Sequence, residues 1–447
     1  MKHRAYPKYK SSGINWIGDI PEGWTIDRIK ASVKSCNNGI WGDEPAGDSN
    51  DTICVRVADF NRDNLSIDIS DPTLRNISER EKSNRTLRKG DLLVEKSGGG
   101  ENQPVGCVVL YSHDTPAVCS NFIAKMSLKD GMNPAFWKYL HAAAYSIRLT
   151  VGSINQTSGI QNLDQDRYFN EKVPFPSLEE QQKIANFLDR ETAKIDELIQ
   201  RQEKLIELVN EERMAIISNA VTKGLNSSIQ FKNSGIEWIG LIPEHWQVGG
   251  LTKFIGPIVD YRGRTPIKTD DGMFLVTARN IKNGQINYLA SKEYVDASSA
   301  ESLLARGRPE IGDVLFTMEA PLGEVALIDR VDIALAQRIV KFRGLKNTIS
   351  NKFLLYWLMS NFCQARLTTL ATGSTALGIK ASKLSQIEFI VPPYDEQLKI
   401  VEFLDKKIEK TDALASKSKK SIQLLKEHRV SLISAAVTGK IDVRGLV

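Results

Sequence analysis

The side chains of this chain that could do specific chemistry are amide, guanidinium and hydroxyl groups gathered in glycine-containing loops. Arg, Asn and Gln can each form two hydrogen bonds with the edge of a guanine or adenine, and Ser, Thr and backbone N–H groups suit phosphate oxygens. Five loops have this composition: KSGGGENQ (96–103), VGSINQTSG (151–159), YRGRTP (261–266), TARNIKNGQ (277–285) and ATGSTALG (371–378). Each loop taken alone is better explained as an ordinary turn, which uses the same residue types. Nucleic-acid reading becomes the better explanation only if two such domains are carried on one rigid rod.

The motifs of common catalytic sites are absent from the sequence. It contains neither GxxxxGK[ST], which binds the phosphates of ATP, nor GxGxxG, which binds dinucleotides. The glycines of SGGG at 97–100 lack the spacing and the following helix of a phosphate loop. VPPY at 391–394 looks like the DPPY or NPPY tetrapeptide of DNA amino-methyltransferases, but Val391 replaces the residue that would hold the target amine. We therefore expect no catalytic residue in this chain.

The sequence does not indicate a metal site either. No metal or triad spacing links the five histidines, which are His3, His113, His141, His245 and His428. The five cysteines include no CxxC pair, which argues against a zinc site and a disulfide framework and favours reduced, mostly buried thiols. Asp91, Glu95 and Lys96 are similar to a nuclease carboxylate cluster, but their separation differs from the usual Glu-x-Lys pair. We expect neither a metal nor a cofactor in this chain.

Two copies of one unit must position the loops. SGINWIGDIPEGW (12–24) returns after 222 positions as SGIEWIGLIPEHW (234–246). Two later segments also return: EEQQKIANFLDRETAKID (179–196) as DEQLKIVEFLDKKIEKTD (395–412), and RMAIISNAVT (213–222) as RVSLISAAVT (429–438). The order is motif, variable region and long helix, twice. A chain of 447 residues is also too long for a single core, so we expect two or more domains.

Each variable region has the pattern of an α/β domain. The β-type runs of the first copy are 52–57, 91–95, 106–110 and 122–126. Those of the second copy are 273–277, 313–317, 324–328 and 338–342. A helix pattern follows in each copy, at 134–145 and at 350–360. This order predicts one α/β domain per copy.

A long helix with an apolar seam closes each copy. Residues 178–222 contain no proline, and their apolar positions follow heptad steps: Ile184, Leu188, Ile195, Leu198, Leu205, Val209 and Ile216. The second seam is Ile400, Leu404, Leu414, Leu425 and Leu432, interrupted by polar Lys407, Ser418 and Ser421. Prolines precede and glycines follow both segments, as at helix ends. Each helix should be roughly 65 Å long.

The two helices should bury their seams against each other. Residues 178–222 carry a net charge of −4 and residues 394–438 carry +2, which favours pairing between the two helices. We predict an α/β (α+β) fold with a pseudo-twofold repeat, in which an antiparallel coiled coil separates two similar globular domains. The predicted boundaries are 1–172 for the first globular domain, 173–224 for the central helix, 225–390 for the second domain and 391–447 for the C-terminal helix. A solvated helical linker without a spacer role is the alternative.

Charge and hydropathy restrict the partners. The whole chain has a net charge of +5, and the regions outside the two helices have +7, a surplus that suits a polyanion. No stretch approaches the roughly 20 apolar residues of a membrane helix, and MKHRAYPKYK at the start lacks the apolar core of a secretory signal. We expect a cytoplasmic protein with no membrane partner.

The complete pattern resembles the specificity (S) subunit of type I restriction-modification systems. The GIxWIGxIPExW opener, the variable α/β region and a PxxEQxxI helix ending in ISxAVT all occur twice, and they cover essentially the whole chain. In the opener the resemblance rests on Trp16, Ile17, Gly18, Pro21 and Trp24, with Trp238, Ile239, Gly240, Pro243 and Trp246. In the helices it rests on Pro176, Glu180, Gln181, Ile184, Leu188 and Asp189, with Pro393, Glu396, Gln397, Ile400, Leu404 and Asp405.

The resemblance implies a non-catalytic subunit with two target recognition domains, each reading one half of a bipartite, asymmetric site in double-stranded DNA. The helices would set the gap of unspecified bases. Such subunits assemble with two methyltransferase subunits, which carry S-adenosylmethionine, and with restriction subunits, which use ATP and Mg²⁺. A role in phage defence follows. On the residues alone, a stand-alone DNA-binding module and a dimeric protein-binding scaffold stay open.

Site residues follow from position relative to the family pattern. We expect base or backbone contacts from Arg56, Asn61, Ser97, Asn121, Gln156, Thr157, Arg279, Asn280, Lys282, Thr317, Gln337, Arg338 and Thr375. The resemblance also implies that the methyltransferase subunits bind Gln181, Ile184, Leu188, Gln397, Ile400 and Leu404. No motif identifies the target bases or the spacer length.

Overall fold

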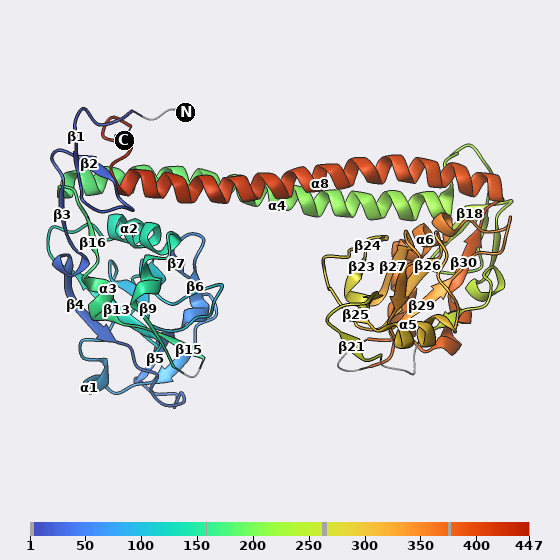
Figure 1. Ribbon diagram of the computed structural model, residues 1–447, viewed down its shortest axis with the longest axis horizontal. Helices are drawn as coiled ribbons and strands as arrows, with labels where there is room; N and C mark the ends of the chain where they lie inside the picture. Colours follow the sequence, from blue (N-terminus) through green and yellow to red (C-terminus); the bar gives the residue numbers. More distant parts are fainter. Residues whose placement is uncertain (1–3, 158, 262–265, 374–376, 447) are drawn as a thin grey trace. The chain divides into compact units, whose positions relative to one another are not determined.

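The computed structural model describes residues 4–157, 159–261, 266–373 and 377–446. The chain divides into two compact units: unit 1 comprises Met1–Glu203 and Lys420–Val447, and unit 2 comprises Lys204–Lys419. Each unit contains one globular domain and parts of the two long helices, α4 (Leu178–Lys223) and α8 (Tyr394–Val437) (Figure 1). The predicted boundaries at 172, 224 and 390 divide the chain by element instead of by compactness, and they stay a prediction.

Unit 1 is built on a four-stranded antiparallel sheet with the order β11-β9-β13-β4. Its strands are β4 (Val33–Asn38), β9 (Leu92–Glu95), β11 (Val108–Leu110) and β13 (Ile123–Leu128). A second sheet, β12-β5-β8, comprises β5 (Asp51–Val55), β8 (Leu74–Asn76) and β12 (Ala117–Cys119). A third, β10-β15-β14, comprises β10 (Ser97–Gly98), β14 (Ile154–Thr157) and β15 (Ile160–Leu163).

Short pairs and helices complete unit 1. The two-stranded pairs are β1 (Tyr9–Ser11) with β2 (Asp19–Pro21), β3 (Thr25–Arg28) with β16 (Lys172–Phe175), and β6 (Phe60–Asn61) with β7 (Ser66–Ile67). The helices are α1 (Glu79–Lys82), α2 (Pro134–Ser146) and α3 (Gln165–Phe169). Asn133 caps α2, because its side chain accepts a hydrogen bond from the N–H of Phe136 at 2.9 Å.

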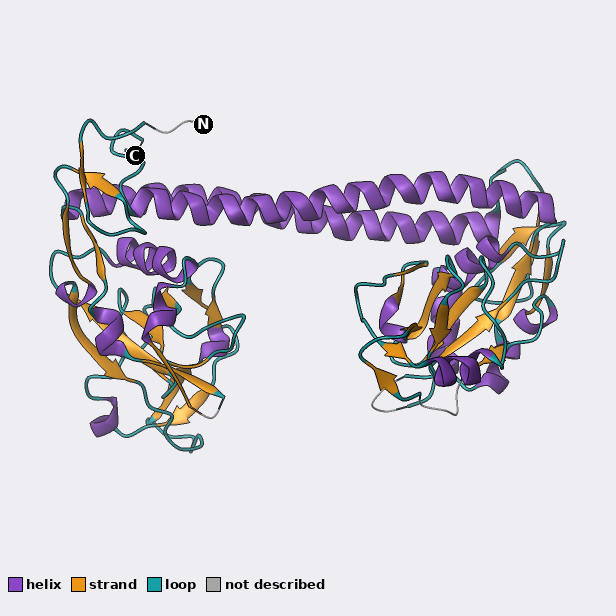
Figure 2. Ribbon diagram, viewed as in Figure 1, coloured by secondary structure: helices purple, strands orange, loops and turns teal. Residues whose placement is uncertain are grey.

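Unit 2 repeats this plan with its own strands (Figure 2). Its antiparallel sheet, β20-β29-β26-β27, comprises β20 (Val259–Asp260), β26 (Val314–Met318), β27 (Leu322–Leu327) and β29 (Ile339–Phe342). The second sheet, β21-β25-β22-β28, comprises β21 (Lys268–Thr269), β22 (Met273–Val276), β25 (Tyr294–Val295) and β28 (Ile333–Leu335). The pairs are β17 (Phe231–Asn233) with β18 (Leu241–Pro243), β19 (Gln247–Gly250) with β30 (Glu388–Val391), and β23 (Ile281–Lys282) with β24 (Gln285–Ile286). The helices are α5 (Ala297–Leu304), α6 (Asn351–Met359) and α7 (Asn361–Leu370).

The two units share strand order and register. The order β11-β9-β13-β4 corresponds to β27-β26-β29-β20, and the parallel pair β12–β5 corresponds to β28–β22. Glu95 on β9 faces Ile123 on β13, just as Thr317 on β26 faces Ile339 on β29. The predicted mixed α/β fold and internal repeat are confirmed. Residues of the two units can therefore be compared position by position.

The long helices pack antiparallel inside each unit. In unit 1, Leu188 of α4 and Leu432 of α8 belong to one buried cluster, and Arg429 Nε lies 3.3 Å from Asp196 Oδ1. In unit 2, the equivalent cluster is joined by an ion pair of 3.5 Å between Arg213 Nε and Asp412 Oδ1. The two ion pairs are related by the sequence repeat. In both, a position early in one helix meets a position late in the other, as the antiparallel prediction requires.

The predicted seam is wrong at two equivalent apolar positions. Leu198 and Leu414, which are equivalent in the repeat, are 45% and 42% exposed, and Ile199 is buried in place of Leu198. The reason is geometric, because an α-helix has 3.6 residues per turn and a strict seven-residue spacing drifts around it.

The ends of the helices agree with the proline and glycine pattern. VPPY is the junction between β30, which ends at Val391, and α8, which begins at Tyr394. Gly224 and Gly439 follow the two helices with φ of +74° and +75°, the left-handed conformation that glycine tolerates best. None of the helices in the described ranges combines the length and apolar character that crossing a membrane requires.

Candidate nucleic-acid interface

Three predicted DNA-contacting residues of unit 1 meet in one hollow. Arg56 follows β5, Ser97 begins β10, and Asn121 lies just before β13. They line a space of about 450 Å³ together with Trp41, Phe122 and several small residues, which are Val57, Ala58, Gly98, Gly99 and Ser120. We call this space the aromatic hollow. Buried Glu95 also lines it, and burial raises the pKa of that carboxyl group.

Backbone hydrogen bonds hold the segment that carries Asn121 and Phe122. The N–H of Ser120 donates to Val55 O at 2.9 Å, and the N–H of Lys96 donates to Phe122 O at 2.9 Å. The segment is thus tied to two sheets. Gly39 lets the loop that carries Trp41 approach closely, because a Cβ there would collide with the carbonyl oxygen of Cys119. Asn121 and Phe122 are exposed on this rigid support.

The three predicted polar side chains around the hollow differ in whether they already have a hydrogen-bond partner. The guanidinium of Arg56 donates to Asp59, with Nη2 2.7 Å from Oδ1, and this hydrogen bond raises the pKa of Arg56. Ser97 Oγ donates to Asn162 Oδ1 at 2.6 Å. The Asn121 amide forms no hydrogen bond with any residue that the structure describes. Of the predicted contacts in this hollow, Asn121 is the one ready to bind without first losing a partner.

Three predicted residues of unit 1 lie elsewhere. Asn61 is exposed, but its side-chain oxygen accepts the N–H groups of Asp63 and Asn64 at 3.1 Å each. The hollow around Asn61 also contains Asp59, Asp63 and Asp68, and these carboxylates disfavour the approach of a phosphate. Gln156 is exposed on β14, and Thr157 ends that strand with a side chain outside the described atoms.

A basic hollow of unit 1 was not predicted. Exposed Lys34, Arg88 and Lys129 share a space of about 900 Å³ with buried Lys125, whose ammonium lies 3.5 Å from Asp91 Oδ2. The exposed cations come from three separate segments, so no run of basic residues in the sequence marks them. Lysine and arginine side chains in such a space suit the phosphates of a nucleic acid.

In unit 2 the predicted residues form two exposed groups. Arg279 precedes β23, and Lys282 lies on it; both are exposed. Half-buried Gln337 and exposed Arg338 precede β29, and Arg338 Nε lies 3.3 Å from Glu319 Oε1. Thr375 lies outside the described residues.

Two predicted DNA contacts fall on side chains that are buried within unit 2. The Asn280 amide caps Thr277, accepting its N–H at 2.9 Å, and donates to Asn287 O and Ser291 O at 2.9 and 2.8 Å. Thr317 Oγ1 accepts the N–H of Glu324 at 2.9 Å. Both side chains are used inside unit 2 and have no exposed surface for a base. Asn280 and Thr317 were predicted as DNA contacts because they are polar, but contacts with other segments of unit 2 bury both side chains.

The six residues expected to bind methyltransferase subunits are also buried. Gln181, Ile184 and Leu188, and their equivalents Gln397, Ile400 and Leu404, are inside their own units. Gln181 accepts the N–H of Asn133 at 2.9 Å and donates to Pro176 O at 3.0 Å; Gln397 has the same two bonds with Ser350 and Pro392, both at 2.9 Å. These six side chains anchor the helices to the domains, so they are not available to a partner in the chain as it is folded.

The closing tryptophan of each opener has the same anchoring role. Trp24 Nε1 donates to Glu180 Oε2 at 3.0 Å, and Trp246 Nε1 donates to Glu396 Oε2 at 3.1 Å. The repeated Trp and Glu of the two motifs therefore form one duplicated contact. In the described part of the chain, no three or more His, Cys, Asp or Glu side chains gather as a possible metal site.

Comparisons with known proteins agree with this duplicated arrangement. A family model described as the type I restriction modification DNA specificity domain matches residues 55–208 and 244–424. The MjaVIII type I restriction enzyme specificity subunit of Methanocaldococcus jannaschii is 30% identical over 68% of this chain and 70% of its own length. The StySPI specificity subunit of Salmonella potsdam is 22% identical over 96% of this chain and 91% of its own length.

Structural similarity extends over nearly the whole chain. A chain from a structure of complex assembly and conformational transition in a type I R-M system has a TM-score of 0.69 and 17% sequence identity. The match covers 96% of this chain and 99% of that chain. At this identity the likeness supports the fold alone.

Proposed function

The chain belongs to the type I restriction modification DNA specificity family, whose domain it carries twice, and from this premise we propose that it reads DNA for a type I restriction-modification complex. Each unit reads one half of a bipartite site in double-stranded DNA. The observation that carries this proposal is that the two units share one fold but expose different side chains at equivalent positions. At the register position where unit 1 presents Phe122, unit 2 presents Arg338. Two unlike readers recognise an asymmetric pair of half-sites.

Phosphate contacts supply the sequence-independent part of the affinity. The regions outside the long helices carry a net charge of +7, and the basic hollow of unit 1 adds exposed cations on one face of that unit. Neutralised phosphates release counterions, so the affinity falls as salt rises. Arg56, Ser97, Asn121, Gln156, Arg279, Lys282, Gln337 and Arg338 remain the proposed base or backbone contacts.

The long helices fix the gap between the two half-sites. The ion pairs Asp196–Arg429 and Arg213–Asp412 each join α4 to α8 with a largely buried guanidinium. An ion pair that forms at only one alignment of the helices opposes sliding by a turn. The number of unspecified base pairs follows from this alignment.

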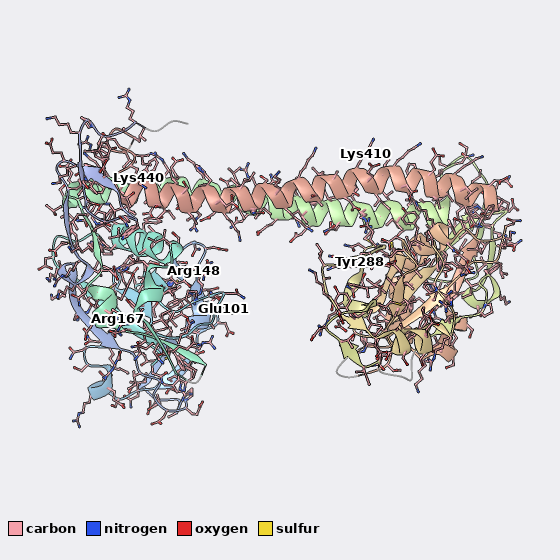
Figure 3. All side chains as sticks on the ribbon, viewed as in Figure 1. Glu101, Arg148, Arg167, Tyr288, Lys410 and Lys440 are labelled. Carbon is pink, nitrogen blue, oxygen red and sulfur yellow. The ribbon has the colours of Figure 1, made fainter. Side chains whose placement is uncertain are left out.

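Catalysis belongs to partner subunits in this proposal. Two methyltransferase subunits supply S-adenosylmethionine, and restriction subunits use ATP and Mg²⁺, in the cytoplasm. The methyltransferase contacts come from exposed helix positions such as Leu198 and Leu414, since the six motif side chains are buried. Lys410 on α8 is one of the exposed charges beside such positions (Figure 3).

Single-molecule, modification-sensitive sequencing of the host genome tests the proposal. Deleting the gene for this chain should abolish methyladenine at one bipartite motif, and returning the wild-type gene should restore it. An unchanged methylation pattern would contradict the proposed role. Co-purification of a methyltransferase with the tagged chain separates a subunit of a complex from a stand-alone DNA-binding module.

A further inference from the structure

The aromatic hollow of unit 1 presents two exposed aromatic side chains to an incoming ligand. Trp41 is 38% exposed and Phe122 is 45% exposed, and both line the hollow of about 450 Å³. Small side chains and glycines form much of the remaining wall. The hollow can therefore accept an apolar group against two ring faces or edges.

The Trp41 ring and the backbone that carries Phe122 are held in place before any ligand arrives. The guanidinium carbon of Arg75 lies 4.6 Å from the ring centre of Trp41, and Arg75 Nε donates to Trp41 O at 3.1 Å. Arg75 is itself buried on β8. Phe122 O accepts the N–H groups of Lys96 and Ser97 at 2.9 and 3.2 Å. Such fixed groups lose little conformational freedom when they bind.

A polar group stands beside the apolar wall. Asn121 precedes Phe122 in the chain, is exposed and also lines the hollow. An Asn amide can bond N6 and N7 of adenine at once, and an apolar side chain can contact the 5-methyl group of thymine. These two features lie together on the major-groove edge of a single A·T pair. Asn121 and Phe122 thus match the two halves of one base pair.

Unit 2 presents different chemistry at the same register position. Because Glu95–Ile123 corresponds to Thr317–Ile339, Phe122 corresponds to Arg338. Arg338 is charged and is paired with Glu319 at 3.3 Å. A guanidinium suits the O6 and N7 acceptors of guanine and offers no apolar seat for a methyl group. Of these two equivalent positions, only Phe122 of unit 1 offers an apolar surface for a methyl group.

We propose that Trp41 and Phe122 form a seat for the 5-methyl group of a thymine, and that Asn121 binds the adenine paired with it. This inference rests on the proposed function and assigns one base pair of the half-site that unit 1 reads. Removing the thymine methyl group, as in uracil, leaves every hydrogen bond of the pair unchanged. Thymine-to-uracil replacement therefore isolates the contact that the seat would make.

The test uses the full chain in its complex with the methyltransferase subunits and the bipartite duplex identified by methylation sequencing. Arg338 belongs to unit 2. The half-site that the complex still recognises when it carries Arg338→Ala is therefore the half-site that unit 1 reads. Each thymine of that half-site is replaced in turn by uracil, and the dissociation constant is measured. One position should lose roughly four-fold in affinity, as expected for one buried methyl group. Phe122→Ala and Trp41→Ala should each bind the thymine and uracil duplexes equally at that position.

Asn121→Ala provides the second arm of the test. It should lose discrimination between A·T and G·C at the uracil-sensitive position, by roughly five-fold or more, and keep the thymine-to-uracil factor. The matched control is Leu74→Ala, which removes an apolar side chain that is 44% exposed on β8, next to Arg75 in sequence and so on the opposite face of the strand. This control should keep both factors. Unchanged binding to a duplex without the site shows that each variant is folded.

Several outcomes would overturn the seat. A unit 1 half-site without an A·T pair excludes it before any variant is made. Specific binding with no uracil-sensitive position, or a uracil effect that persists in Phe122→Ala, removes it and leaves the proposed function intact. Tighter binding when the position is mismatched or abasic would indicate an everted base in the hollow and replace the proposal. Sequence-independent binding by the wild-type complex would instead overturn the proposed function, and the seat with it.

Discussion

Single side chains of the repeated motifs join each globular domain to a long helix, a role that their position in the family pattern does not reveal. Trp24 and Glu180 are far apart in the sequence, and the indole N–H of Trp24 donates to Glu180 at 3.0 Å. Trp246 and Glu396 repeat the contact at 3.1 Å in unit 2. Each bond joins the start of a globular domain to the start of a long helix. The motif is duplicated because both domains need this junction.

Glu180→Ala should destabilise unit 1, because the buried Trp24 indole would lose its hydrogen-bond acceptor. We expect the free energy of unfolding to fall by about 1–3 kcal/mol. Urea-induced unfolding of the full chain, followed by tryptophan fluorescence, measures the change. Glu179→Ala is the control, since Glu179 is exposed and pairs with Lys183 on its own helix. Equal effects of the two variants would contradict the role of the Trp24 contact.

His141 should make unit 1 sensitive to acid. Complete burial lowers the pKa of His141 to about 3, so the folded chain holds this imidazole neutral between pH 7 and pH 5. The unfolded chain binds a proton below about pH 6.5, so stability is complete above that pH and falls as the pH is lowered toward 3. Between pH 7 and pH 5 the wild type should lose about 2 kcal/mol more than His141→Gln.

Unfolding of both proteins at pH 7 and pH 5 checks this expectation. Gln at position 141 can still bond Tyr168 Oη, which lies 2.7 Å from His141 Nδ1. The exposed His428 on α8 gives the control variant His428→Gln, which should keep the pH dependence of the wild type. Parallel pH profiles for the wild type and His141→Gln would count against the prediction.

Arg338→Ala should reduce sequence discrimination by unit 2. A guanidinium that bonds guanine O6 and N7 contributes roughly 1–3 kcal/mol of discrimination, and its removal should hardly change binding to unrelated DNA. Competition binding with specific and unrelated duplexes measures both quantities. Equal losses on the two duplexes would instead identify Arg338 as a phosphate contact. Glu319→Ala, which frees Arg338 from its ion pair, is the companion variant.

At the scale of elements, the two long helices are aligned by duplicated ion pairs. Arg213 and Arg429 are both buried and occupy equivalent repeat positions, and each faces an aspartate of the other helix. Arg213 Nη2 also donates to Asn283 O at 3.1 Å, which ties the helix pair to the globular domain of unit 2. A buried guanidinium with few alternatives for pairing favours one alignment over its neighbours.

Asp412→Lys should destabilise unit 2, because it places a second cation beside the buried Arg213. We expect a loss of a few kcal/mol in the free energy of unfolding. Adding Arg213→Glu should recover part of the loss, because opposite charges face each other again. Thermal unfolding of the single and double variants measures the coupling. Additive losses in the double variant would show that the pair does not hold the helices, and Lys410→Glu on the exposed face is the control.

At the scale of the whole molecule, each unit contains the beginning of one long helix and the end of the other. Unit 1 takes 178–203 from α4 and 420–437 from α8, and unit 2 takes the remaining parts. The end segments RMAIISNAVT (213–222) and RVSLISAAVT (429–438) are similar in sequence. Either end segment could therefore cover the domain that the other covers.

A half-chain of residues 1–224 should form a homodimer. Alone it would expose the apolar side chains of α4 that pack against α8, such as Ile195 and Ile199. In a dimer, the end of each α4 would replace the missing end of α8 on the other copy. Light scattering after gel filtration measures the mass, and Ile217→Asp in the replacing segment should prevent dimerisation. A folded monomer of the half-chain would contradict the expectation.

The amino-acid sequence determined the repeat, the two long helices and the family, because these depend on local spacing and on motifs that read continuously along the chain. Only the tertiary structure decided which polar side chains are available. Asn280 and Thr317 are buried by contacts with other segments, and the Gln181 side chain is bonded within its own unit. Exposure is set by neighbours distant in sequence, so no local pattern predicts it.

The aromatic hollow gives the same contrast within one site. Asn121 was predicted from its residue type and position, whereas Trp41 and Phe122 became site residues only when folding placed them around the same space. Exposed aromatic side chains cannot be distinguished from core residues in the sequence, because most aromatic residues are buried for their apolar surface. The chain thus specifies locally that it carries two DNA-reading domains, and the tertiary contacts specify which side chains each domain presents.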